Sequence, residues 1–272
     1  MELRTVELDD LASPRRTKID SLRVRVFAGQ HEQRAREAAC YRLDEGHAEA
    51  GYGLYLESTS ADPGIEKRLI EFDVTVPWRG RSPGYLAGMI EQLGVGQIEV
   101  RTDDGTAFEP CLEFAATNGW KITPLTSIYA LETGMLRRTP QPEGAEVKRV
   151  GKEDLAAATA LVAETGETAA DSATCALEEK RLWGLYHEGR LVGSAEVLPA
   201  AHHRYADLRP IIHPDSRRGG LATYLVGEVS HELLNENHRL MTEASTSEWA
   251  WRRMAEKLGL TLAAHRLLLQ KS

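Results

Sequence analysis

Residues 211–225 read IIHPDSRRGGLATYL and form the most informative local pattern of the chain. An apolar stretch ends at Pro214, a turn with two arginines and two glycines follows, and a helix with apolar periodicity begins directly after it. Glycines let backbone N–H groups approach an anion closely, and the positive end of a helix dipole favours a phosphate there. The stretch therefore predicts a pyrophosphate site between a strand and a helix.

Two common phosphate-binding patterns do not account for this turn. A nucleoside-triphosphate loop needs G-x-x-x-x-G-K-[ST], in which the lysine reaches the outer phosphates. A dinucleotide fold needs G-x-G-x-x-G after its first strand, with an acidic residue roughly 20 positions later. The sequence fits neither pattern.

The composition limits the classes of partner that the chain can serve. With 272 residues, the chain exceeds the usual length of a single domain, about 100–150 residues, so two domains are expected. The formal net charge is -8, whereas nucleic-acid binding requires a basic face. We therefore expect no nucleic-acid partner, and any anion site has to be local.

Cysteine spacing and hydropathy indicate a reducing, aqueous location. Cys40, Cys111 and Cys175 are scattered without C-x-x-C spacing, so the sequence predicts neither a disulfide framework nor a metal site. The first residues lack the basic and apolar regions of a signal peptide, and no apolar run approaches the roughly 20 residues that cross a bilayer. These observations predict a cytoplasmic protein without a membrane partner.

A polar linker divides the sequence. Residues 137–146 read RRTPQPEGAE, and proline and glycine in a polar run are typical of a linker. We therefore predict an N-terminal domain over residues 1–136, a linker over 137–145 and a C-terminal domain over 146–272.

The two halves show the same order of elements, which is the signature of a repeat. Each half opens with a short strand and an acidic helix start, and each continues with a hairpin that contains Glu-Gly. A strand then ends at Pro77 or Pro214, and an Arg/Gly turn and a helix follow. Each half closes on a glycine, 42 residues later in the first (77 to 119) and 45 residues later in the second (214 to 259). The agreement predicts a duplicated fold.

The turn and the repeat together resemble a known family. The run from Arg217 to Ala222 is similar to the Arg-x-x-Gly-x-Gly/Ala turn of the GCN5-related N-acetyltransferases (GNAT). The order of elements in each half also matches that family, so the whole chain resembles a tandem pair such as that of the mycothiol synthase-like proteins. The resemblance implies an α/β (α+β) fold class with two tandem GNAT-fold domains, each a mixed, mostly antiparallel central sheet flanked by helices.

The resemblance also implies a cofactor, acetyl-CoA or another acyl-CoA, held by the C-terminal domain. We expect the arginines and the backbone N–H groups of the turn and helix to contact the pyrophosphate. The backbone of the preceding strand and two serines are expected to contact the pantetheine arm. The residues concerned are Arg217, Arg218, Gly219, Gly220, Leu221, Ala222, Thr223, Ile211, Ile212, His213, Ser245 and Ser247.

The corresponding turn of the first half departs from the pattern. Aligned on Arg79 and Gly84, it has Ser82 in place of the central glycine and an inserted Pro83, which lacks an N–H group. We interpret the N-terminal domain as degenerate. The alternative is that Pro83 sits where no donor is needed and that both halves bind a cofactor.

The implied reaction is transfer of an acetyl or other acyl group to the amine of a small molecule. Such a transfer needs a base for the ammonium proton, and Glu196 and Asp207 lie on strands expected to border the cleft. His213 also has a suitable pKa in principle. The resemblance also implies a bulge in the strand that carries Asp207. Because of this bulge, simple alternation does not decide which of Asp207, Leu208 and Arg209 faces the cleft.

One departure keeps a second hypothesis open. Many members of the family place a tyrosine four residues before the closing glycine, where it protonates the leaving thiolate. This chain has Ala255 and Ala115 at the two corresponding positions. The alternative to an enzyme is therefore a non-catalytic acyl-CoA-binding or regulatory protein. In either case we expect a monomer or homodimer.

Overall fold

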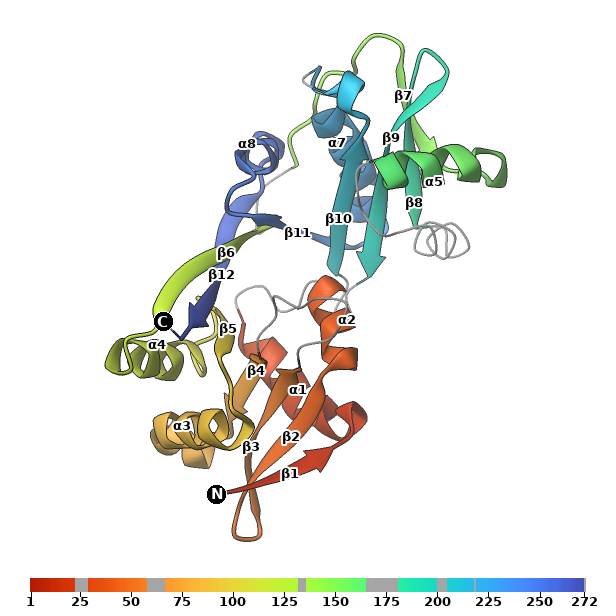
Figure 1. Ribbon diagram of the computed structural model, residues 1–272. Helices are drawn as coiled ribbons and strands as arrows, with labels where there is room; N and C mark the ends of the chain where they lie inside the picture. The colour runs from red at the N-terminus through yellow and green to blue at the C-terminus, as the bar shows by residue number, and fades with distance from the viewer. Residues whose placement is uncertain are drawn as a thin grey trace. The chain divides into compact units, whose positions relative to one another are not determined.

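The computed structural model describes residues 1–22, 29–57, 67–131, 136–164, 181–199, 205–217 and 219–271 (Figure 1). The chain forms two compact units. The first comprises Met1–Ile128 and Ala263–Ser272, and the second comprises Tyr129–Ala200 and Arg204–Leu262.

The first unit is a sheet with helices on its faces. Its strands lie in the order β1-β2-β3-β4-β5-β12-β6, and the neighbouring pairs from β1 to β12 are antiparallel except β4 and β5, which are parallel. The elements are β1 (Glu2–Val6), α1 (Ala12–Ser21), α2 (Gly29–Glu37), β2 (Ala39–Glu45), β3 (Ala48–Leu56), β4 (Arg68–Val74), α3 (Ser82–Leu93), β5 (Gln97–Arg101), α4 (Phe108–Thr117), β6 (Lys121–Ala130) and β12 (Thr261–Gln270), with 3-10 turns at Leu8–Leu11 and Val76–Arg81.

The main core of this unit lies between the sheet and α3. Tyr85, Leu86, Met89 and Ile90 are buried, and their spacing of one, three and four residues places them on one stripe of the helix. Burial of each such side chain contributes roughly 1.5–3 kcal/mol. Gly94 then ends α3 in the left-handed conformation, with φ of 64°, which a side chain would oppose.

The last strand of the chain belongs mostly to the first unit. Its pairing with β5 is antiparallel from Arg266 opposite Arg101 to Gln270 opposite Gln97. Leu269 is fully buried in the core beside α3. The repeat predicts a strand after Gly259 but gives no sign that this strand completes the sheet of the other half.

The second unit repeats the same plan. Its strands lie in the order β11-β10-β9-β8-β7, with β10 and β11 parallel and the other pairs antiparallel. The elements are β7 (Ala145–Arg149), α5 (Leu155–Glu164), β8 (Leu182–His187), β9 (Arg190–Pro199), β10 (Tyr205–Ile212), α7 (Leu221–Asn235), β11 (Arg239–Ser245) and α8 (Trp249–Leu258), with 3-10 turns at Lys152–Asp154 and Pro214–Ser216.

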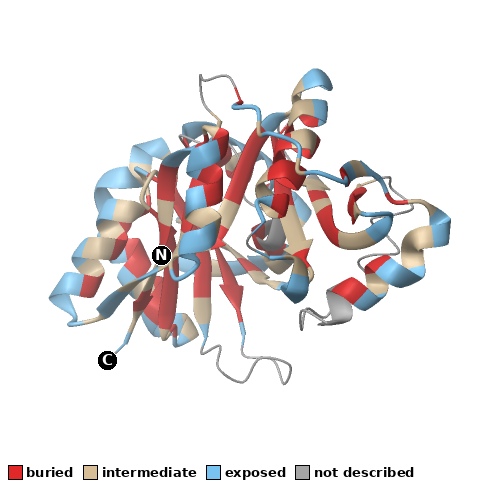
Figure 2. Cartoon of the chain, turned by 90° about the horizontal axis from the view of Figure 1, so that it is seen from above, coloured by how far each residue is buried: buried red, intermediate tan, exposed pale blue. Residues whose placement is uncertain are grey.

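Helices α7 and α5 cover opposite faces of this second sheet. Ala206 and Leu208 of β10 share a core with residues of α7. On the other face, Ala158 of α5 packs against Leu182 of β8. Figure 2 shows the result in both units, with strands largely buried and the outer sides of the helices exposed.

In both units the two parallel strands part soon after they pair. Only Arg68 and Leu69 of β4 pair with β5, although β4 continues to Val74. In the second unit β10 pairs with β11 from Tyr205 to Asp207 and then continues to Ile212. Since the backbone groups beyond these pairs have no strand partner on that side, they need other partners.

The exchanged strand gives a first test. Leu269→Ala should destabilise the chain by about 2–5 kcal/mol, because it opens a cavity in the core of the first unit. Hydrogen exchange should show faster exchange in α3 and β5 and little change in α7 and β10. Leu225→Ala, at an equally buried site in the second unit, is the matched control and should show the reverse pattern. Faster exchange confined to α7 in the Leu269→Ala variant would contradict the exchange.

Candidate functional site

The turn before α7 leaves the start of that helix open. Gly220 is the residue that caps the helix and has φ of 78°, which glycine adopts without strain. A Cβ atom built at Gly219 or at Gly220 would have no heavy atom within 4 Å. Within the described residues no side chain caps α7, so the first N–H groups of this 15-residue helix have no side-chain acceptor there. This geometry is that of an anion site, because the helix dipole adds to the exposed donors.

Arg217 is held beside this open turn. Its Nε atom donates a hydrogen bond to the carbonyl oxygen of Ile212 at 3.1 Å. The contact ties the guanidinium of Arg217 to the end of β10. Arg217 lies two residues before Gly219 in the sequence. Arg218 itself lies outside the described residues.

The backbone at the end of β10 presents alternate groups to its two sides. The N–H group of His213 donates to the oxygen of Val192 in β9, at 2.9 Å, and by alternation Ile211 also points to β9. Ile212 consequently points to the side from which β11 has parted. The Nδ1 atom of His213 accepts from the N–H of Asp215 at 3.2 Å. Of the three strand residues predicted to contact a cofactor, Ile212 is thus the one on the open side.

The two predicted serines lie together at the end of β11. The Oγ atoms of Ser245 and Ser247 are 2.8 Å apart. Trp249 follows at the first position of α8 and is 65% exposed. This tryptophan was not singled out in the sequence analysis.

The two candidate bases lie on the face that α5 covers. Leu208 belongs to the α7 core, so its neighbours Asp207 and Arg209 point to the other face. Glu196 lies directly opposite Arg209 in the register of β9 and β10 and therefore shares that face. The structure thus answers which of the three β10 residues face α5: Asp207 and Arg209 do, and Leu208 does not.

These two carboxylates differ in their surroundings. Glu196 accepts a hydrogen bond from Nη1 of Arg181 at 2.9 Å, and its side chain is 17% exposed. Asp207 is 5% exposed, at the last paired position of β10 and β11. Glu196 is therefore the more accessible of the two. Arg181 was not identified from the sequence, because the contact joins the start of β8 to the next strand.

The corresponding turn of the first unit offers fewer backbone donors. Pro83 stands in the first turn of α3 and has no N–H group, so α3 lacks one of the free donors that the first turn of α7 has. The hydroxyl of Ser82 is buried and donates to the oxygen of Arg79 at 2.8 Å.

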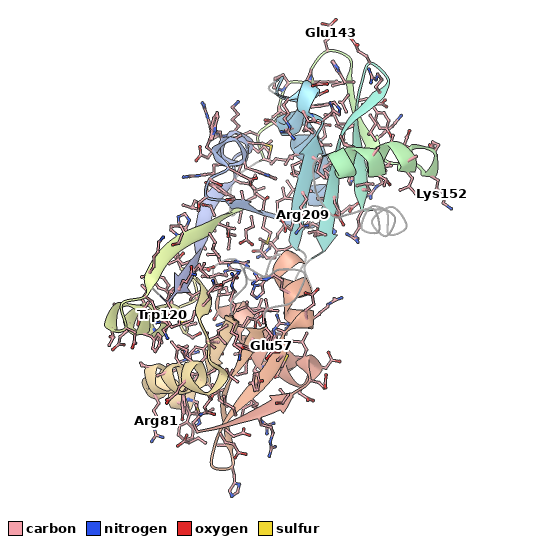
Figure 3. All side chains as sticks on the ribbon, in the orientation of Figure 1. Glu57, Arg81, Trp120, Glu143, Lys152 and Arg209 are labelled. Atoms are coloured by element: carbon pink, nitrogen blue, oxygen red, sulfur yellow. The ribbon has the colours of Figure 1, made fainter. Side chains whose placement is uncertain are left out.

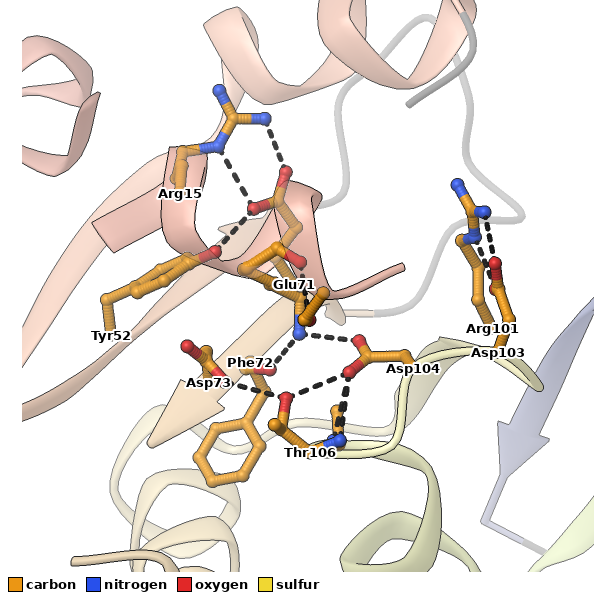
Figure 4. A network of polar contacts seen from close by, with 12 residues as sticks. Arg15, Tyr52, Glu71, Phe72, Asp73, Arg101, Asp103, Asp104 and Thr106 are labelled. Carbon is orange, nitrogen blue, oxygen red and sulfur yellow. Dashed lines mark hydrogen bonds and ion pairs between the residues drawn. The ribbon is translucent and has the colours of Figure 1, made fainter. Parts of the chain in front are cut away.

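Charged side chains occupy the space where β4 and β5 part (Figure 4). The Nζ atom of Lys18 lies 2.5 Å from Asp104 and donates to the oxygen of Phe72, in β4, at 2.7 Å. Beside this pair, Glu71 binds both Arg15, at 2.6 Å, and His31, at 2.9 Å. The carbonyl that lost its strand partner is thus satisfied by a lysine.

A second cluster completes the filling. Glu99 of β5 forms ion pairs with Arg34, Arg68 and Arg266 at 2.8, 2.7 and 3.4 Å. The cavity left among these groups measures about 20 Å³, which is room for about one water molecule. The space between the strands of the first unit is therefore closed by its own side chains. We call this set of residues the charged network: Arg15, Lys18, His31, Arg34, Arg68, Glu71, Glu99, Asp104 and Arg266.

Within the charged network the pKa values of Glu71, Glu99 and Lys18 shift towards the ionised forms, whereas burial lowers the pKa of His31. Burial alone would raise the pKa of Glu71, but the hydrogen bond from His31 and the charge of Arg15 outweigh it and lower the pKa to about 2. Burial is likewise outweighed at Glu99 by Arg34 and Arg266, which lower its pKa to about 2. Burial lowers and Asp104 raises the pKa of Lys18, and the net shift is upward.

Three solved structures have a similar fold. An acetyltransferase of the GNAT family from Colwellia psychrerythraea is 18% identical, with a TM-score of 0.85 over 100% of both chains. A GCN5-related N-acetyltransferase from Sphaerobacter thermophilus is 14% identical, with a TM-score of 0.72 over 99% of this chain and 95% of the other. A tandem GNAT protein from the clavulanic acid biosynthesis pathway is 14% identical, with a TM-score of 0.67 over 100% and 98%.

The sequence comparison adds the family of the second unit. The model of the acetyltransferase (GNAT) family matches residues 152–260. No curated protein matches the chain. Residues 152–260 thus match the model of the GNAT family, and solved GNAT proteins share the fold of the whole chain, so the predicted resemblance and fold class are confirmed. The mycothiol synthase-like pairing and the exact domain limits stay predictions.

The described residues contain neither a membrane-spanning helix nor a cluster of metal ligands. No helix there is long and apolar enough to cross a membrane. Across the same parts of the chain, no three histidine, cysteine or acidic side chains gather as a metal site would require.

The charged network gives a test of its own. Since the folded pKa of Glu71 lies below its ordinary value near 4.5, the stabilisation is complete above about pH 4.5 and is lost as the pH falls towards 2. Glu71→Gln should lower the free energy of unfolding at pH 7 by about 3–5 kcal/mol, because it leaves Arg15 buried without its charge partner. It should also flatten the dependence of stability on pH between 4.5 and 2.

Chemical denaturation at several pH values measures both effects. Glu113→Gln, an exposed site on α4 in the same unit, is the control and should change stability by no more than about 0.5 kcal/mol. A Glu71→Gln variant as stable as the original chain would contradict the role assigned to this carboxylate.

Proposed function

We propose that the chain is an acyl-CoA-dependent N-acyltransferase that transfers an acetyl or related acyl group to the amine of a small molecule. The observation that carries the proposal is the open start of α7, with Gly219 and Gly220 beside the parted end of β10. It falls within the residues that match the GNAT family.

The residues of this turn fit the phosphates of an acyl-CoA. The N–H groups from Leu221 to Thr223 are the first of α7, and no described heavy atom lies within 4 Å of a Cβ built at Gly219 or Gly220, so no described side chain blocks an anion there. Arg217 lies where a guanidinium can pair with a phosphate. The N–H group of Ile212 is placed to hold the pantetheine arm. The bound cofactor supplies an acyl group activated as a thioester.

Glu196 is the base that we assign to the amine. Its side chain is partly exposed on the α5 face, close to the point where β10 and β11 part. A carboxylate there can take a proton from the ammonium of the acceptor, directly or through one water. The ion pair with Arg181 fixes the direction of the carboxylate and so acts as a positioning contact. Asp207 is the second candidate, with less access to solvent.

The position of Ala255 supports the competing, non-catalytic hypothesis. Ala255 is 1% exposed and lies in the core of the second unit, where it offers no hydroxyl to a departing thiolate. The enzyme would then depend on water as the acid. Both hypotheses expect acyl-CoA binding, but only the enzyme releases free thiol when it is given amines.

The structure of the first unit supports a non-binding role for it. Lys18 and the rest of the charged network fill the space that a pantetheine arm would need, and Pro83 removes a donor from α3. We therefore assign acyl-CoA to the second unit alone.

Equivalent substitutions in the two units test the position of the cofactor. Gly219→Asp should weaken acetyl-CoA binding at least 30-fold, because it places a carboxylate where the phosphates are expected. Gly84→Asp, at the start of α3, is the matched control and should leave the affinity unchanged. Both glycines have open space around a built Cβ and neither needs a positive φ, so neither change should strain the fold. Isothermal calorimetry of the full chain gives the affinities, and an equal loss in both variants would contradict the proposal.

A second pair of variants tests the base. Glu196→Gln should lower kcat by about 100-fold or more, because it removes proton transfer, and should leave the Kd of acetyl-CoA unchanged. Glu143→Gln, an exposed site in the same unit, is the control. Thiol release with a panel of primary amines provides the readout. Unchanged kcat in Glu196→Gln would move the assignment to Asp207, which Asp207→Asn then tests.

A further inference from the structure

Arg209 differs from the other described arginines of the second unit because one of its guanidinium nitrogens is buried without a hydrogen-bond acceptor. It lies on β10, where Figure 3 labels it. The side chain is partly buried, and its Nη2 atom is shut off from solvent with no hydrogen-bond acceptor. Within the described part of the chain, Arg209 has neither a hydrogen bond nor an ion pair. A buried guanidinium N–H without an acceptor is destabilising, so its retention calls for a ligand.

The nearest carboxylate does not neutralise Arg209. Glu196 lies directly opposite it in the register, and Cβ atoms of such pairs are about 4.5–5.5 Å apart. Glu196 nevertheless turns to Arg181, which holds it at 2.9 Å. Two arginines thus flank one carboxylate, and the second of them stays available to an anion from outside the chain.

The position of Arg209 places that anion near the acceptor. Arg209 follows Leu208, whose oxygen accepts a hydrogen bond from Thr242 of β11 at 3.4 Å, just beyond the last paired residues of the two strands. It shares the α5 face with Glu196 and Asp207, whereas α7 packs on the opposite face of the sheet and begins beyond Ile212. A phosphate bound at α7 is therefore not the anion that Arg209 meets.

We infer that Arg209 recognises an anionic group on the acceptor, so that the substrate class is an amine that also carries a carboxylate or a phosphate. The inference rests on the proposed function and deepens it. Glu196 and Asp207 attract the ammonium, and Arg209 pairs with the anion in a bidentate way. One face thus offers both signs of charge to a zwitterion.

Substrate pairs that differ only in the anion test this inference. Amino acids are compared with their amides, and phosphoethanolamine with ethanolamine, with acetyl-CoA in excess. At least one anionic amine should exceed its neutral partner about 100-fold in kcat/KM, and the two series show whether carboxylate or phosphate is preferred. Arg209→Met should abolish that preference and leave turnover of neutral amines and the Kd of acetyl-CoA unchanged. Arg209→Lys should restore part of the preference, because it keeps the charge.

A readout without turnover separates this inference from the proposed function. Thermal shift without acetyl-CoA should show stabilisation of the original chain, but not of Arg209→Met, by the preferred anionic amine. The Tm of Arg209→Met without ligand should equal or exceed that of the original chain, since a buried unsatisfied charge is removed. A lower Tm, equal use of neutral amines, or a loss of acetyl-CoA affinity in Arg209→Met would overturn the inference. Anion-dependent stabilisation without any thiol release would overturn the proposed function instead.

Discussion

The separation of two parallel strands is the constraint on which both units depend. β4 leaves β5 after Leu69, and β10 leaves β11 after Asp207. Each departure leaves backbone groups without a strand partner in the interior of a sheet, and such groups cannot stay unsatisfied. What satisfies them determines what each unit can do.

The two units solve this problem with different chemistry. In the first, Lys18 donates to the oxygen of Phe72 while Asp104 balances its charge. Opposite charges in a buried site attract one another strongly. Removal of one partner leaves the other as a buried charge without compensation for its lost hydration. The result is a closed, rigid unit. In the second, Arg217 donates a hydrogen bond to the oxygen of Ile212, and the hydroxyl of Thr242 donates to the oxygen of Leu208. The end of this strand leads into the turn before α7. The two similar units therefore differ in whether charged side chains fill the space between the parted strands.

The sequence predicted those parts of the fold that short patterns specify. The proline-turn-helix pattern at Pro214 and the matching spacing of the two halves were sufficient for the family, the fold class and the place of the glycines. The position of Pro83 in the first turn of α3 was also predictable, because a proline has one fixed effect wherever it stands.

The remaining features depend on contacts between residues far apart in the sequence. Lys18 and Asp104 are 86 positions apart (18 to 104), and no local pattern pairs them. The exchange of β12 depends on which sheet edge is free, which periodicity does not report. In the sequence, Arg209 is one of three neighbouring strand residues with nothing to distinguish it. The structure shows that it lies opposite Glu196 and that this carboxylate binds Arg181.

The central claim is that one of two similar units binds the cofactor and the other has lost that ability. The most direct measurement is the stoichiometry and location of acetyl-CoA binding to the full chain, by calorimetry together with backbone amide shifts. The account predicts one equivalent per chain, with shifts concentrated from Gly219 to Thr223. Two equivalents, no binding, or shifts centred on the start of α3 would contradict it.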